Sequence, residues 1–236
     1  MKRSPNRVKA AGRKSKILIV DDHSVVREGL STVINQEPDL AVCGVAENAS
    51  EAMTSVSALK PDAAIVDLSL EGRNGLDLVK DFKARHPQLR VMVLSMHDEA
   101  LYAERALQAG AHGYIMKKES TRNILAALRH IIDGGVYASG RVTENMMQRV
   151  ARHGMVQPRT PVELLSDREL EVFELLGEGL TTHETADKLH LSMKTVSCYR
   201  QNIKAKLNLK TAAELVRYAV HWAKTGQTDQ APSAGA

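Results

Sequence analysis

Five polar side chains follow short apolar runs of the sequence, and together their types could carry out phosphoryl-transfer chemistry. Three are carboxylates, one is a hydroxyl and one is an ammonium group: Asp21, Asp22, Asp67, Ser95 and Lys117. Carboxylates that share a cleft repel one another, which raises their pKa values unless a cation lies among them. Such oxygen ligands suit Mg²⁺, which needs only one or two carboxylates besides water and phosphate. A carboxylate beside Mg²⁺ and a lysine can attack a phosphoryl group, because both cations neutralise charge on the transferred oxygens.

The apolar runs predict the elements that must position these side chains. They span Ile17–Val20, Ala41–Ala46, Ala63–Val66, Val91–Leu94 and Gly113–Met116. Each is too short for a helix and lacks the alternation of a half-buried strand, so each predicts a strand buried on both faces. Between them, apolar residues recur at the i, i+3, i+4 spacing of helices. Alternating strands and helices predict an α/β fold, namely a flavodoxin-like, doubly wound, five-stranded parallel sheet with helices on both faces.

The carboxyl ends of these strands form the edge at which such sheets bind ligands, near the switch in strand order. The first and third strands are neighbours there, so we expect Asp21, Asp22 and Asp67 to lie together. Ser95 and Lys117 follow the next two strands and should lie nearby. Taken singly, the residues have ordinary interpretations, as caps of the first helix, the start of a loop or a solvated charge. The arrival of all five at one edge favours a site.

Four stretches carry a family resemblance over roughly residues 16–135. ILIVDDHSVVREGL, AAIVDLSLEGRNGLDLV, VMVLSMHDE and QAGAHGYIMKK resemble the receiver domain of bacterial two-component response regulators. The resemblance implies that Asp67 accepts the phosphoryl group and that Lys117 contacts it. It also implies that Asp21, Asp22, Asp67 and the backbone carbonyl of Ser69 bind Mg²⁺. Ser95 and Tyr114 match the hydroxyl and the aromatic residue that switch upon phosphorylation.

Three positions near the expected site vary within this family or depart from its pattern. Glu71 stands where the family usually has a proline, which would stiffen that turn, so the geometry of the loop is open. Ser69 and His97 match two variable positions that influence phosphoryl lifetime in the family. Our hypothesis is that these two side chains tune the access of water to the acyl phosphate; the alternative is that both are exposed loop residues without a kinetic role.

The region 163–224 has only helical periodicity and predicts a helix-turn-helix. Ser166 with Glu169, and Thr181 with Glu184, form capping boxes that open two helices, and Gly177 and Gly179 are expected to end the first of them. Ser192 is a suitable N-cap for a third helix over Met193–Leu207, and a fourth is expected at about Ala212–Ala223. Two helices joined by a three- to four-residue turn are typical of helix-turn-helix proteins, whose second helix enters the DNA major groove.

The charge of this region is strongly polarised. Residues 163–187 contain one basic and eight acidic residues, whereas residues 188–217 contain seven basic residues and one acidic residue. The basic part holds the expected recognition helix, as phosphate contacts require. An all-helical unit that binds protein instead of DNA is the alternative.

The stretch from Leu165 to Ala219 also resembles the LuxR-type DNA-binding domain, which with the receiver indicates the NarL/FixJ class of response regulators. The resemblance implies DNA contacts by Lys194, Ser197, Cys198, Arg200, Gln201 and Lys204, and core positions for Val196, Ile203 and Leu207. The lysines and the arginine suit phosphates, and the other three suit base edges. Thr182 and His183 depart from the Asn and basic residue often found in the family, which would weaken a phosphate contact. Cys198 could make the helix sensitive to oxidation, although a passive contact is the simpler interpretation.

Composition sets the broad class. The chain has 236 residues, of which 43% are hydrophobic and 25% charged, as in ordinary soluble proteins of one large or two small domains. Cys43 and Cys198 cannot by themselves form a disulfide framework or a four-ligand zinc site. Apolar runs stay well below the ~18–20 residues of a membrane span, and no secretory leader precedes them. We therefore expect a cytoplasmic protein without membrane association.

These observations predict five regions and one function. The regions are a basic disordered arm (1–15), a receiver domain (16–135), a linker (136–162), the helix-turn-helix domain (163–224) and a disordered tail (225–236). The function is phosphorylation-dependent transcription regulation rather than enzymatic turnover. Its expected partners are a sensor histidine kinase, double-stranded DNA and a second copy of the chain. The alternatives are a phosphate-independent DNA-binding protein and a Mg²⁺-dependent aspartyl phosphatase, although Ser69 stands where such phosphatases have a second carboxylate.

Overall fold

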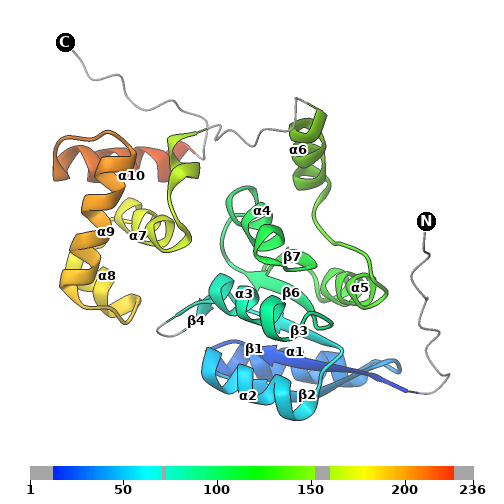
Figure 1. The fold of residues 1–236 in the computed structure, drawn as a ribbon. Coiled ribbons are helices and arrows are strands. Elements are labelled where there is room, and N and C mark those ends of the chain that lie inside the picture. The colour runs from blue at the N-terminus through cyan, green and yellow to red at the C-terminus, as the bar shows by residue number, and fades with distance from the viewer. Residues whose placement is uncertain (1–12, 71–72, 152–159, 226–236) are drawn as a thin grey trace. The chain divides into compact units, whose positions relative to one another are not determined.

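The computed structural model describes residues 13–70, 73–151 and 160–225 of the chain. They form two compact units, one containing residues 13–70 and 75–143 and the other containing Arg73, Asn74 and the described residues from Glu144 onward. Most of the predicted arm, Glu71 and nearly all of the predicted tail lie outside the described residues. Figure 1 shows a sheet surrounded by helices in the first unit and only helices from Pro161 onward.

A five-stranded parallel sheet forms the centre of the first unit. Its strands are β1 (Ser15–Val20), β2 (Leu40–Ala46), β3 (Ala63–Val66), β6 (Arg90–Ser95) and β7 (Gly113–Met116). They lie in the order β2-β1-β3-β6-β7, with every neighbouring pair parallel. The predicted fold class, all five predicted strands and the adjacency of the first and third strands are thereby confirmed. All four residues of β3 are buried, as expected for a strand covered on both faces.

Five helices connect and cover the strands: α1 (Ser24–Gln36), α2 (Ala49–Leu59), α3 (Gly75–Arg85), α4 (Glu99–Ala109) and α5 (Thr121–Ile132). Local sequence explains several of their starts. Asn48, Asp98 and Ser120 each accept a backbone N–H of the first turn of the helix that follows, which satisfies donors that the helix itself leaves unpaired.

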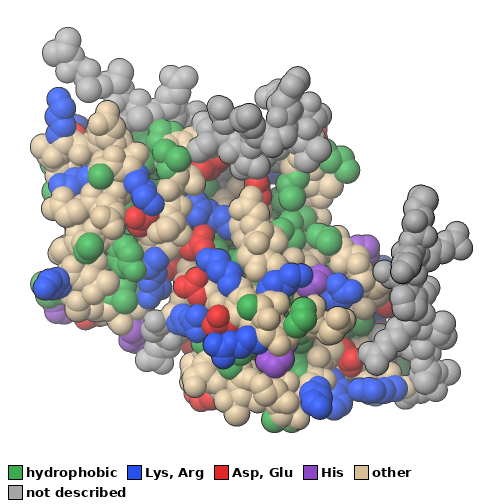
Figure 2. All heavy atoms as spheres, viewed as in Figure 1, with side chains coloured by type: hydrophobic (Ala, Val, Ile, Leu, Met, Phe, Trp, Pro, Cys, Tyr) green, Lys and Arg blue, Asp and Glu red, His purple; other side chains and the backbone are tan. Residues whose placement is uncertain are grey.

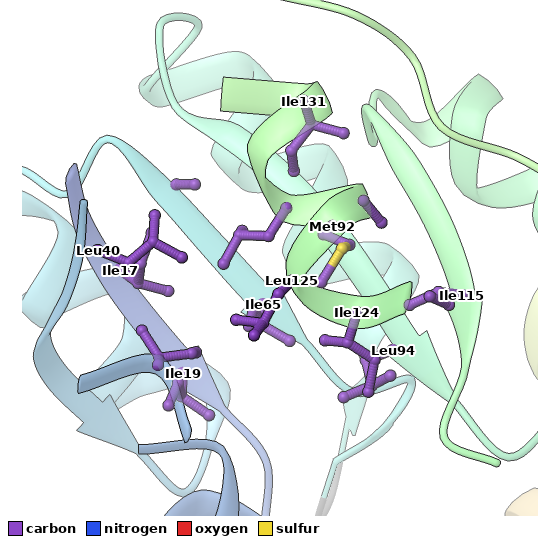
Figure 3. Close-up of a cluster of buried hydrophobic side chains, with 14 residues drawn as sticks. Ile17, Ile19, Leu40, Ile65, Met92, Leu94, Ile115, Ile124, Leu125 and Ile131 are labelled. Atoms are coloured by element: carbon purple, nitrogen blue, oxygen red, sulfur yellow. The ribbon is translucent and has the colours of Figure 1, made fainter. Parts of the chain in front are cut away.

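The hydrophobic core on one face of the sheet lies beneath α5 (Figure 3). Alternate residues of the strands, such as Ile17 and Ile19 of β1, meet Leu125 and Leu128 of α5 there. Because side chains alternate across a strand, Leu18 and Val20 point to the opposite face, and both are fully buried. The sheet is therefore a rigid, doubly covered platform, and its polar strand ends are held in place by buried neighbours.

The first unit continues past the predicted end of the receiver. Tyr137 pairs with the sheet edge, because its carbonyl accepts the N–H of Tyr114 at 3.0 Å and its own N–H donates to the carbonyl of His112 at 2.9 Å. Ser139 then donates to Glu99 of α4 at 2.9 Å. The following helix α6 (Gly140–Ala151) is longer than the one or two turns expected in the linker. Two short strands that sequence patterns did not predict, β4 (Ser69–Leu70) and β5 (Arg73–Asn74), follow β3.

The described part of the chain from Pro161 onward contains only helices and their connections, as predicted. A short 3₁₀ helix (Pro161–Leu164) precedes α7 (Asp167–Gly177), α8 (Thr182–Lys188), α9 (Met193–Lys206) and α10 (Ala212–Thr225). Both predicted capping boxes are present, and Ser192 caps α9. Among the described helices, none is long and apolar enough to cross a membrane.

Candidate functional site

The carboxylates predicted to share one edge of the sheet lie together there. Asp21 and Asp22 directly follow β1, and Asp67 directly follows β3. One side-chain oxygen of each lies within 4.8 Å of the others, together with a ring nitrogen of His23. The ammonium group of Lys117, which follows β7, lies 2.7 Å from Asp21 Oδ2 and 2.8 Å from Asp67 Oδ2. Four of the five polar residues thus meet, although Asp67 and Lys117 are 50 residues apart in the sequence.

Burial makes this cluster electrostatically strained. Burial raises the pKa of the Asp67 carboxyl, and the ion pair and hydrogen bond with Lys117 only partly oppose that rise. Burial by itself lowers the pKa of the Lys117 ammonium, but its contacts with Asp67 and Asp21 outweigh burial and raise it. One cation therefore serves two buried carboxylates, and a third carboxylate stands beside them. The cluster has an excess of negative charge that a further cation would relieve.

The acidic pair is not used to cap α1, which was its alternative interpretation. The N-cap of α1 is His23, whose side chain makes no capping hydrogen bond. Asp22 Oδ1 is buried and has no hydrogen-bond partner among the described residues, although His23 Nδ1 lies 2.6 Å away as an ion-pair contact. A buried carboxylate oxygen without a hydrogen bond is costly unless a cation binds it. The donors present, all carboxylate oxygens with one imidazole close by, fit a hard divalent ion such as Mg²⁺.

Ser95 lies on β6, the strand next to β3, and Tyr114 lies on β7, the strand beyond β6. Ser95 is fully buried at the end of β6, and its hydroxyl accepts the N–H of His97 at 3.1 Å. Its carbonyl accepts the N–H of Lys117 at 2.8 Å. Tyr114 of β7 is 1% exposed, and its hydroxyl donates to the carbonyl of His97 at 2.7 Å. The hydroxyl and the aromatic ring are therefore linked through one loop residue, His97.

The two variable positions singled out in the sequence contact each other. Ser69 Oγ and His97 Nε2 are 3.1 Å apart, across 28 residues of sequence. The His97 ring also lies over Tyr102 of α4, with the ring centroids 4.6 Å apart. These contacts join the loop after Asp67 to the loop after Ser95, which the sequence pattern by itself did not reveal.

Sequence patterns missed two residues that shape this site. Arg27 of α1 is only 9% exposed and donates to the backbone carbonyls of Asp21 and Asp22. Gly75 begins α3 and lies so close to Asp67 that an added Cβ would fall 2.1 Å from the Asp67 carbonyl oxygen. The sequence does show an arginine within an apolar helical face and a glycine at a helix start. Neither pattern indicates which group the residue contacts.

The second candidate surface is the exposed face of α9. Lys194, Ser197, Cys198 and Gln201 are exposed, and Arg200 and Lys204 are half-buried. Val196, Ile203 and Leu207 are buried, which confirms their predicted core positions. Spacings of three, four and seven residues place the exposed set on one side of the helix. In Figure 2 the Lys and Arg side chains of this unit, on the left of the view, stand on its surface. This face has the exposure and charge that phosphate and base contacts require.

One of these side chains is held by the preceding helix. Arg200 Nη1 donates to the Thr182 hydroxyl at 2.8 Å, which joins α9 to the start of α8. Thr182 thus contacts an arginine of α9, the helix expected to read DNA, at a position where the resembling family often has Asn. The neighbouring departure, His183, is exposed and pairs with Asp187 at 2.8 Å within α8.

Two family models match the chain, one over each unit. The response regulator receiver domain matches residues 17–129, and the bacterial regulatory proteins of the luxR family match residues 163–219. The first range contains the whole acidic cluster, and the second contains α7, α8 and α9.

Known proteins are similar over most of the chain. The oxygen regulatory protein NreC of Staphylococcus haemolyticus is 35% identical over 209 residues, which cover 87% of this chain and 96% of NreC. A structure of RcsB from Salmonella enterica serovar Typhimurium is 25% identical with a TM-score of 0.57, covering 89% of this chain and 100% of that one. A LuxR-family response regulator from Aurantimonas sp. SI85-9A1 is 28% identical with a TM-score of 0.55, covering 59% and 99%. The chain belongs to the two-component response regulators of the NarL/FixJ class, in which a receiver domain precedes a luxR-family DNA-binding domain.

Proposed function

We propose that phosphorylation of Asp67 controls DNA binding by this chain through the exposed face of α9. The observation that carries the proposal is the contact of Lys117 with both Asp21 and Asp67, at 2.7 and 2.8 Å, beside the Oδ1 atom of Asp22, which accepts no hydrogen bond. These residues form the arrangement that a carboxylate needs to accept a phosphoryl group. Asp67 is the acceptor, and the donor is the phosphohistidine of a sensor kinase.

The residues of the cluster have distinct tasks in this reaction. An Asp67 carboxylate oxygen bonds to phosphorus as the P–N bond of the phosphohistidine breaks and the imidazole leaves. The Lys117 ammonium neutralises charge on the transferred oxygens. Asp21, Asp22, Asp67 and the Ser69 carbonyl are the groups that would hold Mg²⁺, which when bound supplies further neutralisation of the phosphoryl charge.

The Ser95 hydroxyl and the Tyr114 ring can pass a conformational change from the phosphorylation site to the surface of α4. An acyl phosphate on Asp67 offers acceptor oxygens that attract the Ser95 hydroxyl away from the N–H of His97. The loop at His97 also accepts the Tyr114 hydroxyl, so its movement releases the ring and repacks the surface of α4. Ser69 and His97 lie on this path, and we propose that their contact also limits the access of water to the acyl phosphate.

The second unit reads DNA in this proposal. Lys194, Arg200 and Lys204 contact phosphates, and Ser197, Cys198 and Gln201 reach base edges in the major groove. The structure of the related RcsB was solved bound to a promoter in the presence of a phosphomimetic, which supports the same activity here. A homodimer on a two-fold DNA site is the form expected when the receiver is phosphorylated, because a symmetric pair doubles the contacts.

The test is a DNA-binding selection on the full-length protein with and without a small-molecule phosphodonor, repeated with Asp67→Ala. We expect enrichment of a two-fold symmetric sequence that depends on the phosphodonor and is lost in Asp67→Ala. Binding that is equal in all four samples would favour the phosphate-independent alternative. Steady turnover of small phosphate esters that requires Asp67 would instead favour the phosphatase alternative.

The phosphoryl-lifetime proposal has its own measurement. We expect Ser69→Asn and His97→Glu to change the rate of autodephosphorylation, followed by loss of label from the isolated phosphoprotein. Rates equal to that of the parent in both variants would show that the two loop residues have no kinetic role.

A further inference from the structure

A buried arginine lies behind the acidic cluster and is not one of its ligands. Arg27 is the fourth residue of α1, and it is only 9% exposed. Its Nη1 donates to the carbonyl oxygen of Asp21 at 2.7 Å and to that of Asp22 at 2.9 Å. Its Nη2 pairs with Glu47, which follows β2. A buried guanidinium is costly unless its donors are paired, and these contacts pair three of its five N–H groups.

The two carbonyl contacts fix the backbone from which the carboxylates project. Because one nitrogen binds both oxygens, the peptide planes after Asp21 and after Asp22 are both constrained. The N–H of His23 donates to Asp21 Oδ1 at 3.0 Å and fixes the next residue. Helix capping does not hold this turn, since the N-cap of α1 makes no side-chain hydrogen bond. Arg27 therefore holds the backbone from which both carboxylates project.

We propose that Arg27 is a positioning residue for the divalent-cation site, acting through the backbone of the acidic pair and not by contact with the ion. The inference rests on the proposed function, since it assumes that Asp21 and Asp22 hold Mg²⁺. Glu47 orients the guanidinium from the far side, so the acidic pair, Arg27 and Glu47 form one connected unit. Partners that orient metal ligands typically change metal affinity by ~10–100-fold when they are removed.

A merely structural role for Arg27 makes a different prediction. In that case its loss would lower the free energy of unfolding and leave the affinity of the folded protein for Mg²⁺ unchanged. Arg129 provides a matched control in the same unit. It bonds Asp39 at 2.7 and 2.8 Å and pairs with Glu37 at 2.5 Å, thereby joining α5 to the α1–β2 loop without contacting the acidic pair.

The experiment measures Mg²⁺ binding to the unphosphorylated full-length protein by titration calorimetry. It is done without urea, at a temperature where unfolding curves show each variant to be folded. The parent is compared with Arg27→Met, Arg27→Lys and Arg129→Met, and Asp22→Asn identifies the heat that belongs to the site. We expect Arg27→Met to raise the Kd about tenfold or more. Arg27→Lys, which keeps one donor near both carbonyls, should recover most of that loss, and Arg129→Met should leave the Kd within about twofold of the parent although it lowers stability.

The possible failures are distinguishable. A Kd for Arg27→Met within twofold of the parent overturns the positioning role and leaves the proposed function intact. A parent without Asp22-dependent Mg²⁺ binding removes the proposed function and this inference together. If Arg27→Met does not fold, Arg27→Gln, whose polar side chain is too short to reach both carbonyls, takes its place: a Kd shifted by more than Arg129→Met shifts it supports the role, and an equal Kd overturns it.

Discussion

The close approach of Gly75 to Asp67 gives a prediction that combines stability and chemistry. The N–H of Gly75 donates to the carbonyl of Leu68 at 2.8 Å, which brings the start of α3 against the loop after β3. A Cβ at position 75 would lie 2.1 Å from the Asp67 carbonyl oxygen and 2.7 Å from Leu68 Cα. Both contacts are with backbone atoms, so no side-chain rotation relieves them. Gly75→Ala must therefore move the backbone that carries the phosphoryl acceptor.

The size of the effect follows from this geometry. Real Cβ atoms essentially never approach other heavy atoms within 3.0 Å, so the two segments must separate by roughly 1 Å. Forcing extra volume into a packed site typically costs ~1–3 kcal/mol of unfolding free energy. A misplacement of about 1 Å can lower the rate of a positioned reaction ~10²-fold. Gly75→Ala should thus destabilise the first unit and slow phosphorylation of Asp67 much more than its stability loss accounts for.

Urea unfolding and phosphorylation kinetics together test this prediction. Far-UV circular dichroism follows the whole chain, and Trp222, the single tryptophan, reports the second unit by fluorescence. Phosphorylation by a small acyl phosphate is measured on the folded protein. Gly29→Ala is the matched control, because a Cβ at this α1 position meets nothing within 4 Å. Gly29→Ala should become phosphorylated on Asp67 at the parent rate, and its free energy of unfolding should be higher by up to ~1 kcal/mol. Parent-like stability and phosphorylation in Gly75→Ala would refute the argument.

Three further predictions concern other parts of the two units. Burial, followed by neighbouring positive charges, lowers the pKa of His112 to about 4; the folded state then binds fewer protons than the unfolded state, so stability falls as the pH drops from 6.5 to 4, and His112→Asn should flatten this dependence in unfolding curves. Lys206 lies 2.6 Å from the buried Glu169 of the first capping box, so Lys206→Met leaves a buried carboxylate without its cation. Lys206→Met should therefore lower the urea midpoint reported by Trp222 more than the double variant Glu169→Gln with Lys206→Met does. Gly177→Ala would place a Cβ 2.7 Å from a backbone oxygen of α10 and should destabilise the second unit by ~1–3 kcal/mol in the same assay. An unchanged urea midpoint in Lys206→Met or Gly177→Ala, or an unchanged pH dependence in His112→Asn, would contradict the corresponding prediction.

Local sequence was enough to predict the elements of this protein. Strand β3 is four apolar residues without alternation, a run that is too short for a helix and that favours a strand buried on both faces. The capping boxes at Ser166 and Thr181 were predicted from residues three apart, because a cap involves only the first turn of its own helix. The parallel sheet then placed Asp21, Asp67 and Lys117 at one edge.

The contacts that refine the site were not predictable in the same way. Gly177 was expected to end α7 through its flexible backbone, and it does lie at the helix end, but its lack of a side chain also admits the backbone of α10. The contact of Ser69 with His97 joins loops 28 residues apart, and its existence depends on rotamers and loop paths. Such features depend on distances between segments, which residue spacing along the chain does not contain.

The sequence by itself determined the alternation of strands and helices, the set of carboxylates with a lysine, and the polarised charge of the second unit. These depend on residue type and on periodicity, which the chain carries locally. Only the tertiary structure decided that Lys117 is shared by two buried carboxylates, that an oxygen of Asp22 lacks a hydrogen bond, and that Arg27 holds the acidic pair from behind. Burial and hydrogen-bond geometry belong to the packed molecule, because they arise where segments that are distant in sequence exclude water from one another.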